Sequence, residues 1–331
     1  MIKSIFIFFF MLMCVGVASP VCGQAQSGIN RFLTPSDTLH KGRLLGEGIA
    51  TTAGFSGMMI VLNEAWYNQF DRGKFHFYDD NDEWLQLDKI GHVWTCYQAG
   101  RLGQGMLNWA GVEDQKAVLY GSTLGLAFMT GVEVLDGFSE KWGFSWGDMA
   151  SNVTGSALFA GQELLWDEQR IALKFSIENV NYPDNPEIQD RITGLYGEGF
   201  EKLLKDYNAQ TYWLSVNPAA FMHDTGTFPK WLNIAVGYSG ENMFGGRVNF
   251  WCPAGYDDNI RPEDCPPAMR IDYSHINRYR QYYLSFDVDV SKIQSRSPLL
   301  RTLLGAANMI KIPAPAIELN SKSDMHFRVL R

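Results

Sequence analysis

Charged residues are scarce in this chain, and no stretch of it is basic. Asp, Glu, Lys and Arg make up 19% of the 331 residues, and the formal net charge is −8. A typical soluble domain is about 25% charged. Proteins that bind nucleic acids carry clustered Lys and Arg that neutralise phosphates. The sequence therefore argues against a nucleic-acid partner, and its 46% hydrophobic content argues against intrinsic disorder.

The common catalytic signatures are also missing. The sequence contains no G-x-S-x-G nucleophile motif, no H-E-x-x-H zinc motif, no phosphate-binding P-loop and no C-x-x-C pair. Ser139, in GFSEKWGFS, has no convincing base beside it in the sequence. The sequence therefore identifies neither a cofactor nor a metal, and any chemistry must use residues outside these motifs.

Cysteine is equally rare, and two of the 5 cysteines lie near the N-terminus. Lys3 precedes an apolar run over 5–17, and the small and turn-forming residues ASPVCGQAQ follow it. This is the layout of a secretory signal peptide, and the apolar run is too short to span a membrane as a helix. We predict a signal peptide over 1–24 and therefore export. A lipid anchor at Cys22 is the alternative, although the residues before it lack the usual Leu.

The remaining cysteines predict one disulfide and one thiol. Cys252 and Cys265 flank a polar, Pro-rich segment, CPAGYDDNIRPEDCPP. In an exported chain this pair predicts a disulfide that closes a short loop. A zinc site is the alternative, but further ligands at suitable spacing are missing nearby. Cys96, which has Trp and Tyr neighbours, is predicted to be a buried thiol.

The distribution of apolar residues divides the chain into a helical part and a β-containing part. Apolar segments with helical spacing precede residue 167, and period-two alternation typical of strands follows it. We therefore predict an α+β protein, with a bundle of about four helices over 44–166 and a β-containing region over 167–331. The expected helices are 44–70, 84–109, 117–132, 146–166 and 298–311, and the expected strands are 170–178, 207–216, 232–240, 281–290 and two short segments near the C-terminus.

The uncharged cores of the first helices are borderline in length for crossing a membrane. They run for about 14 to 16 residues, whereas a spanning helix needs about 20. Gly121 and Gly125 have the four-residue spacing that lets helices approach closely. Either the helices form a compact bundle buried against itself, or the bundle lies inside a membrane. Periplasmic, outer-membrane and inner-membrane placement all stay open.

Despite this apolar character, the predicted helices carry polar residues at paired spacings. Residues three or four apart share one face of a helix. Because a buried charge is costly unless it is paired or neutralised, such pairs indicate a packing, metal-binding or catalytic role. The pairs are Asp88 and His92, Glu133 and Asp136, and Asp148 and Asn152.

If three helices pack together, these pairs converge into a set of carboxylates, one imidazole and one amide. Such a set suits a metal site, or a general acid and base whose pKa values are separated by their surroundings. A carboxylate can also orient the imidazole and raise its basicity. The candidate catalytic residues are Asp88, His92, Glu133 and Asp148, and the candidate ligand-binding residues are Lys89, Arg101, Asp136, Asn152, Gln162 and Glu163.

A purely structural role for the same residues is the alternative. Asp148 follows Gly147 near a predicted helix start, where carboxylates cap free amides and suit the helix dipole. Lys89 lies next to Asp88 and neutralises it. Buried polar networks also fix the register of helices without any chemistry. Convergence of the side chains within about 5 Å at an open pocket would favour a site over a structural network.

Two segments carry a resemblance to known families. DKIGHVWTCYQAGR and EVLDGFSEKWGFSWGDMASNVTGSALFAGQELLW resemble the uncharacterised family of predicted periplasmic lipoproteins that includes YfiM, and the resemblance extends over about 44–315. The helical part is more loosely similar to VanZ-like membrane proteins, which share Asp-Lys-x-x-His, an acidic residue and Asp-x-x-x-Asn-x-x-Gly. The matching positions are Asp88, Lys89, His92, Glu133, Asp148, Asn152 and Gly155.

The resemblance implies a compartment rather than an activity. VanZ-like proteins are linked to glycopeptide-antibiotic resistance and have no settled chemistry, and this chain departs from them in its signal peptide and its β-rich extension. We expect a membrane-associated envelope protein whose polar cluster stabilises the bundle or binds an envelope lipid or cell-wall component. The alternative is a metal-assisted hydrolase or transferase that acts on a lipid or cell-wall substrate.

Overall fold

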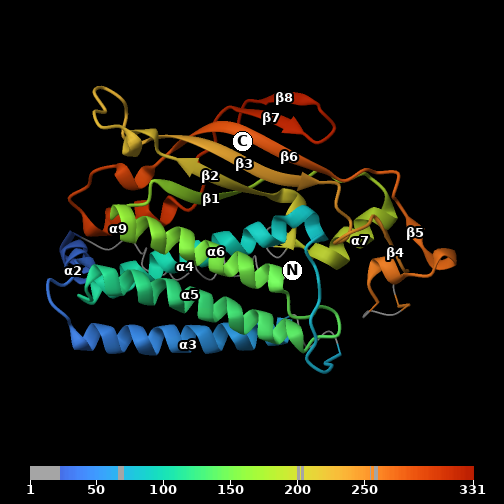
Figure 1. Cartoon of the computed structure of the whole chain (residues 1–331), viewed down its shortest axis with the longest axis horizontal. Coiled ribbons are helices and arrows are strands. Elements are labelled where there is room, and N and C mark those ends of the chain that lie inside the picture. Colours follow the sequence, from blue (N-terminus) through green and yellow to red (C-terminus); the bar gives the residue numbers. More distant parts are fainter. Residues whose placement is uncertain (1–22, 66–70, 200–201, 203–204, 254, 257–259) are drawn as a thin grey trace.

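A bundle of long helices is covered on one side by a β-sheet, which confirms the predicted α+β class (Figure 1). The computed structural model describes residues 23–65, 71–199, 202, 205–253, 255–256 and 260–331. The predicted signal peptide lies outside the described residues except for its last two positions, and Cys22 lies outside them as well.

Four long helices form the bundle. α4 packs against both α5 and α6, α5 also packs against α6, and α3 forms the outer layer farthest from the sheet (Figure 1). Among the described helices, α5 alone is long and apolar enough to cross a membrane, a test that the core helix of a soluble protein also passes. The bounds are α3 Lys41–Ala65, α4 Leu87–Trp109, α5 Asp114–Gly137 and α6 Trp146–Trp166.

Glycines bring these helices close together. A Cβ atom on Gly121 would lie 2.5 Å from the backbone nitrogen of Gln104, and one on Gly155 would overlap the carbonyl oxygen of Val93. Contacts this short exclude any side chain, so α5 and α6 both approach the backbone of α4 directly. The close approach predicted from Gly121 is therefore present in the structure.

The sheet has six antiparallel strands in the order β1-β2-β3-β6-β7-β8, so its order follows the chain. β1 lies nearest the helices and β7 and β8 lie farthest from them (Figure 1). The bounds are β1 Ile171–Ile177, β2 Gln210–Val216, β3 Leu232–Glu241, β6 Tyr279–Val288, β7 Ala316–Asn320 and β8 Met325–Arg328.

The sheet curls until its two edges are joined through residues 309–314. Phe175 of β1 donates its backbone N–H to Met309 O at 3.0 Å and accepts from Lys311 N at 3.0 Å. Ala314 and Arg331 exchange two backbone hydrogen bonds, at 3.2 and 3.0 Å. The sheet therefore has a concave inner face and a convex outer face.

An apolar core joins α4 to the sheet. Trp94 and Tyr97 of α4 are buried with Leu173 and Phe175 of β1 and Tyr212 of β2. The predicted apolar face of this helix therefore packs on the first two strands. The burial of such aromatic side chains contributes about 25 cal/mol for each Å² of apolar surface removed from water.

A smaller unit packs beside the end of the bundle where α4 and α6 begin (Figure 1). It contains a two-stranded sheet, and the predicted disulfide between Cys252 and Cys265 is present, with Cα atoms 5.5 Å apart. Residues 23–33 form a helix that the sequence analysis did not predict. The remaining bounds are α2 Gly23–Leu33, α7 Pro186–Tyr196, β4 Phe250–Trp251, β5 Ile271–Asp272 and α9 Pro298–Ala307.

The glycine contact between α4 and α6 yields a first prediction. Gly155→Ala should lower the free energy of unfolding by about 1–3 kcal/mol, because the new methyl group pushes the two helix backbones apart. Urea unfolding followed by circular dichroism measures the change. Gly161→Ala is the control on the same helix, because nothing lies within 4 Å of its Cβ position. An equal loss in both variants would contradict the packing argument.

Candidate functional site

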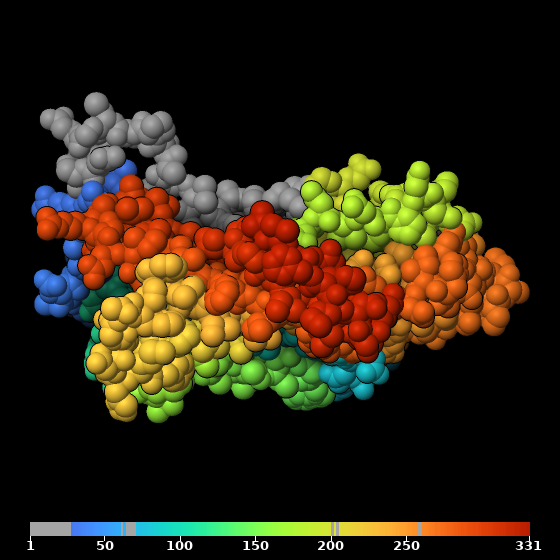
Figure 2. Space-filling model, turned by 90° about the horizontal axis from the view of Figure 1, so that it is seen from above, coloured from blue at the N-terminus to red at the C-terminus, as the bar shows by residue number. Residues whose placement is uncertain are grey.

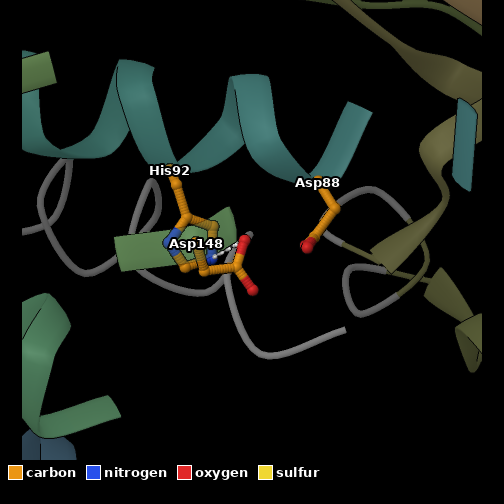
Figure 3. A group of neighbouring side chains, drawn as sticks. All are labelled: Asp88, His92 and Asp148. Carbon is orange, nitrogen blue, oxygen red and sulfur yellow. Dashed lines mark ion pairs between the residues drawn. The ribbon is translucent and has the colours of Figure 1, made fainter. Parts of the chain in front are cut away.

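Polar side chains from three helices meet at one end of the bundle. α4 and α6 begin at this end and α5 ends there, so Asp88, Asp148 and Glu133 are brought together (Figure 1). One ligand atom each of Asp88, His92 and Asp148 lies within 4.8 Å of the others, and all three side chains are buried (Figure 3). The convergence expected from the paired spacings therefore occurs.

His92 is fully buried and its orientation is set by an amide. Its Nδ1 lies 2.7 Å from Asn152 Oδ1, and the Cys96 thiol donates to the same oxygen at 3.5 Å. An amide oxygen only accepts hydrogen bonds, so Nδ1 carries a proton. Glu133 Oε1 lies 3.7 Å from Nδ1 and reinforces this assignment. In neutral His92, Nε2 is therefore the basic nitrogen.

The basic nitrogen of His92 points at a carboxylate. His92 Nε2 lies 3.5 Å from Asp148 Oδ1 (Figure 3). A neutral imidazole nitrogen and an ionised carboxylate oxygen both present lone pairs, so they repel each other unless a proton or a cation lies between them. The pair is thus suited either to an imidazolium–carboxylate contact or to joint coordination of a metal ion.

Lys89 partly neutralises this end of the bundle. Its ammonium donates to Asp148 Oδ1 at 2.9 Å and to Asp80 Oδ1 at 2.5 Å, and it lies 3.4 Å from Asp88 Oδ2. The single Lys89 ammonium group therefore contacts three carboxylates. Because uncompensated buried charges are costly, a further positive charge would stabilise the cluster. Acidic residues at this end include Asp80, Glu83, Asp88, Glu133, Asp136 and Asp148.

The start of α6 is fixed by a serine cap. Ser145 Oγ accepts from Asp148 N at 3.1 Å and donates to Asp80 Oδ1 at 2.5 Å. Its backbone N–H donates to Glu133 Oε2 at 3.3 Å. The N-cap serine thus links the loop, α5 and α6. The capping role expected for Asp148 itself falls to Ser145, so the Asp148 carboxylate is directed at Lys89 and His92 instead.

Asp88 is held from the sheet side of the molecule. Tyr207 Oη donates to Asp88 Oδ1 at 2.7 Å. Burial, and then the neighbouring Asp88 carboxylate, raises the pKa of Tyr207 well above its usual value, so the phenol stays protonated and donates. The turn before α4 also positions Asp88, because Trp84, Leu85 and Gln86 all have positive φ values of 50°, 51° and 64°. Conformations of this kind cost about 1–3 kcal/mol each and occur where the surroundings impose them.

The cluster lies at the floor of an open cavity. The cavity has a volume of about 610 Å³, and Asp88, Asp136 and Asp148 line it from the bundle. Its other wall comes from α7 and the disulfide-bonded segment, including Arg191, Cys252, Arg261 and Glu263. A ligand therefore reaches the carboxylates from outside the bundle.

Cationic and acidic side chains together line the rest of this cavity, with Arg191, Arg261 and Lys141 beside Glu187, Asp190 and Glu263. Burial lowers the pKa of Arg191 to about 10, which still leaves its guanidinium protonated at neutral pH. The Arg261 guanidinium lies 3.7 Å from the centre of the Tyr78 ring. Lys141 also lines the cavity and donates to Ile260 O at 3.0 Å. Guanidinium and ammonium groups in this position suit an anionic ligand.

Three of the predicted ligand-binding residues lie elsewhere. Arg101 is 13 residues beyond Asp88, about 20 Å along α4, and donates to Gln98 Oε1 at 2.9 Å. Gln162 accepts from the backbone of Ile171 at 2.8 Å and so ties the end of α6 to β1. Glu163 accepts from Gln104 at 3.2 Å. These side chains form a separate polar group at the opposite end of the bundle.

The sequence reasoning missed several contributors to the site. Asp80 lies in the acidic loop FYDDNDE, whose composition is typical of an exposed segment. The only signal for a part in the site is that the loop directly precedes α4. Tyr207 and Arg191 come from distant parts of the chain that no helical spacing connects with Asp88. Asp136 and Lys89, by contrast, were predicted. Asp136 lines the cavity, and Lys89 contacts Asp148.

The contacts of Lys89 yield a second prediction. Lys89→Met should lower the free energy of unfolding by about 3–5 kcal/mol, because it leaves three carboxylates together without the ammonium. Urea unfolding at neutral pH measures this loss. Lys116→Met is the control, because Lys116 pairs with Glu113 at 2.7 Å on the surface of α5 and should lose less than about 1 kcal/mol. Similar losses in the two variants would mean that the buried ammonium has no special role.

The comparison with known families covers the helical part. Residues 73–161 match the family described as predicted periplasmic lipoprotein (DUF2279), a segment that holds all the residues of the cluster except Tyr207. No curated protein and no solved structure matches the chain. The match agrees with the export predicted from the N-terminus and supports a periplasmic protein of the cell envelope whose family is uncharacterised.

Proposed function

We propose that this envelope protein binds a divalent cation at Asp88, His92 and Asp148, and with it an anionic ligand in the cavity above them. The observation that carries the proposal is the convergence of these ligand atoms within 4.8 Å, beside an open cavity that Asp88 and Asp148 line and with His92 buried behind them. A network that served packing alone has no need of an opening to solvent.

The donor set indicates which cations fit. Two carboxylates and one imidazole suit borderline or hard ions such as Zn²⁺ and Mn²⁺, whereas thiolate ligands are absent from the three residues. Asn152 holds the Nδ1 proton of His92 and so directs Nε2 toward the ion. A cation there would offset the repulsion between Nε2 and the Asp148 carboxylate.

The cavity indicates the class of ligand. An anionic headgroup, phosphate or carboxylate, would be attracted both by the cation and by Arg191, Arg261 and Lys141. Envelope lipids and cell-wall precursors carry such headgroups. The resemblance to YfiM-type lipoproteins and, in the helical part, to VanZ-like proteins supports this placement in the envelope.

Metal-assisted hydrolysis or group transfer is the second candidate function. Asp136 favours it, because this buried carboxylate lines the cavity beside the proposed ligands without being one of them. A bound cation would acidify a water molecule and polarise the ligand. Asp136 would then act as the general base that accepts a proton from that water.

Cation binding is the direct test of the proposal. We expect the purified mature protein to bind one Zn²⁺ or Mn²⁺ ion per chain in equilibrium dialysis followed by metal analysis. Asp148→Asn and His92→Gln should each weaken binding at least tenfold, because each removes a ligand. Glu163→Gln, at the far end of α6, is the matched control and should bind as the parent does.

Failure of this test has a defined meaning. A parent protein that binds neither ion, while keeping its folded circular dichroism spectrum, would leave the cluster as a structural network. Equal binding by Asp148→Asn and the parent would place the ion elsewhere.

The Asp136→Asn variant separates binding from chemistry. If the site is catalytic, this variant should keep the bound cation and lose most of its hydrolytic activity, about a hundredfold or more for a lost general base. The measurement is release of inorganic phosphate from a phosphatidic acid or polyprenyl phosphate substrate in mixed micelles. The absence of turnover by the parent on both substrates, together with normal cation binding, would favour the binding function over the catalytic one.

A further inference from the structure

The alternation of polar and apolar residues in the sheet is inverted. On β3, Ile234 and Val236 are exposed, whereas Asn233 and Ala235 are buried. The sheets of soluble proteins normally bury the apolar face and expose the polar one. The same inversion continues on β6 and β7, where the exposed positions are Tyr282, Leu284, Phe286, Ile317 and Leu319 and the buried ones are Gln281, Ser285, Asp287, Glu318 and Asn320.

The exposed apolar side chains form one continuous surface, called here the outer face. Strand register places Leu214, Val236, Leu284, Ile317 and Phe327 side by side across five strands, and each is 40–69% exposed. The row begins at Leu173 of β1, which pairs with Leu214 and is buried against α4. The outer face is therefore covered by α4 at β1 and at Tyr212 of β2, and its exposed part runs from Leu214 of β2 to Phe327 of β8.

The inner face holds several paired polar groups beside a small buried cluster of Trp213, Ala235, Tyr283 and Ala316. The Lys174 ammonium lies 2.7 Å from Asp287 Oδ2, and both side chains are fully buried. Ser215 Oγ donates to Asp287 at 2.7 Å, and Gln281 donates to Glu318 Oε1 at 3.0 Å. These pairs explain how the sheet tolerates a polar interior. They also leave the apolar residues outward with no core of their own to pack into.

The curvature of the sheet decides what covers the outer face. Because residues 309–314 join the two edges of the sheet, the outer face is convex. Two copies of a convex surface touch along a narrow strip and cannot bury it in a symmetric dimer. A fluid apolar phase, by contrast, follows any curvature. The last strands, drawn in red, lie at the molecular surface on the sheet side (Figure 2).

The lengths of the two central strands, and the side chains at their ends, fit a lipid bilayer. β3 and β6 have ten residues each, or about 33 Å of extended strand, and strands that cross a bilayer have about 9–11 residues. Lys230 and the half-exposed Trp231 precede β3. At the opposite end, the Lys322 ammonium lies 4.1 Å from the centre of the Tyr279 ring. Aromatic and basic side chains at both ends match the headgroup layers of a bilayer.

We propose that the outer face of the sheet contacts the acyl chains of a lipid bilayer. The apolar-outward and polar-inward alternation is the pattern of strands that face lipid. The inference goes beyond the cation site and does not depend on it, because none of its residues contacts Asp88, His92 or Asp148.

Spin labels on the outer face test the proposal. The mature protein is reconstituted in phosphatidylethanolamine and phosphatidylglycerol vesicles with a nitroxide at Val236→Cys, Leu284→Cys or Ile317→Cys. The remaining native cysteines are a buried thiol and a disulfide, so the introduced residue takes the label. Collision with oxygen, which dissolves in lipid, should exceed collision with a water-soluble nickel chelate at all three positions. Asp184→Cys, exposed beside α7, is the control and should show the reverse order.

Each other outcome would overturn the proposal. Higher collision with the nickel chelate at the three positions would mean that the outer face contacts water. Low collision with both reagents would mean that a second copy or another protein covers it. Failure of the folded parent to float with the vesicles in a density gradient would show that the protein does not engage lipid at all.

Discussion

The Lys89 ammonium is the interaction on which the end of the bundle depends. It bridges the loop, α4 and α6 through contacts with Asp80, Asp88 and Asp148. Without it, like charges on neighbouring helices would repel at short range in a poorly hydrated setting. The position of His92, the direction of the Asp148 carboxylate and the shape of the cavity floor all follow from holding those two helices together.

Close packing makes that concentration of charge feasible. Gly121 and Gly155 bring α5 and α6 onto the backbone of α4, so side chains from three helices reach a common point. The same closeness lets a single amide, Asn152, orient the imidazole. A wider bundle would admit water between the carboxylates, and their mutual effects would then be screened.

Much of this arrangement follows from local patterns in the sequence. Spacings of three and four residues predicted the pairs on α4, α5 and α6, and period-two alternation predicted β1, β3 and β6, because both patterns act within one element. Asp80, Tyr207 and Arg191 escaped prediction because only tertiary packing brings their loops to α4. α7 was missed as well, although Asn185 caps it and Pro186 occupies its first turn, which is a recognised helix start. Alternation alone did not indicate which face of the sheet is buried, and the curl of the sheet turns the polar residues inward.

The disulfide determines in which compartment the cavity wall is completed. Cys252 belongs to the wall of the cavity, on the side opposite the carboxylates. The bond forms in oxidising compartments and stays open in the reducing cytosol. In a newly made chain, the carboxylates of the site are therefore present before the disulfide has closed the cavity wall opposite them. Export to an oxidising compartment would let the disulfide form and so close this wall of the cavity.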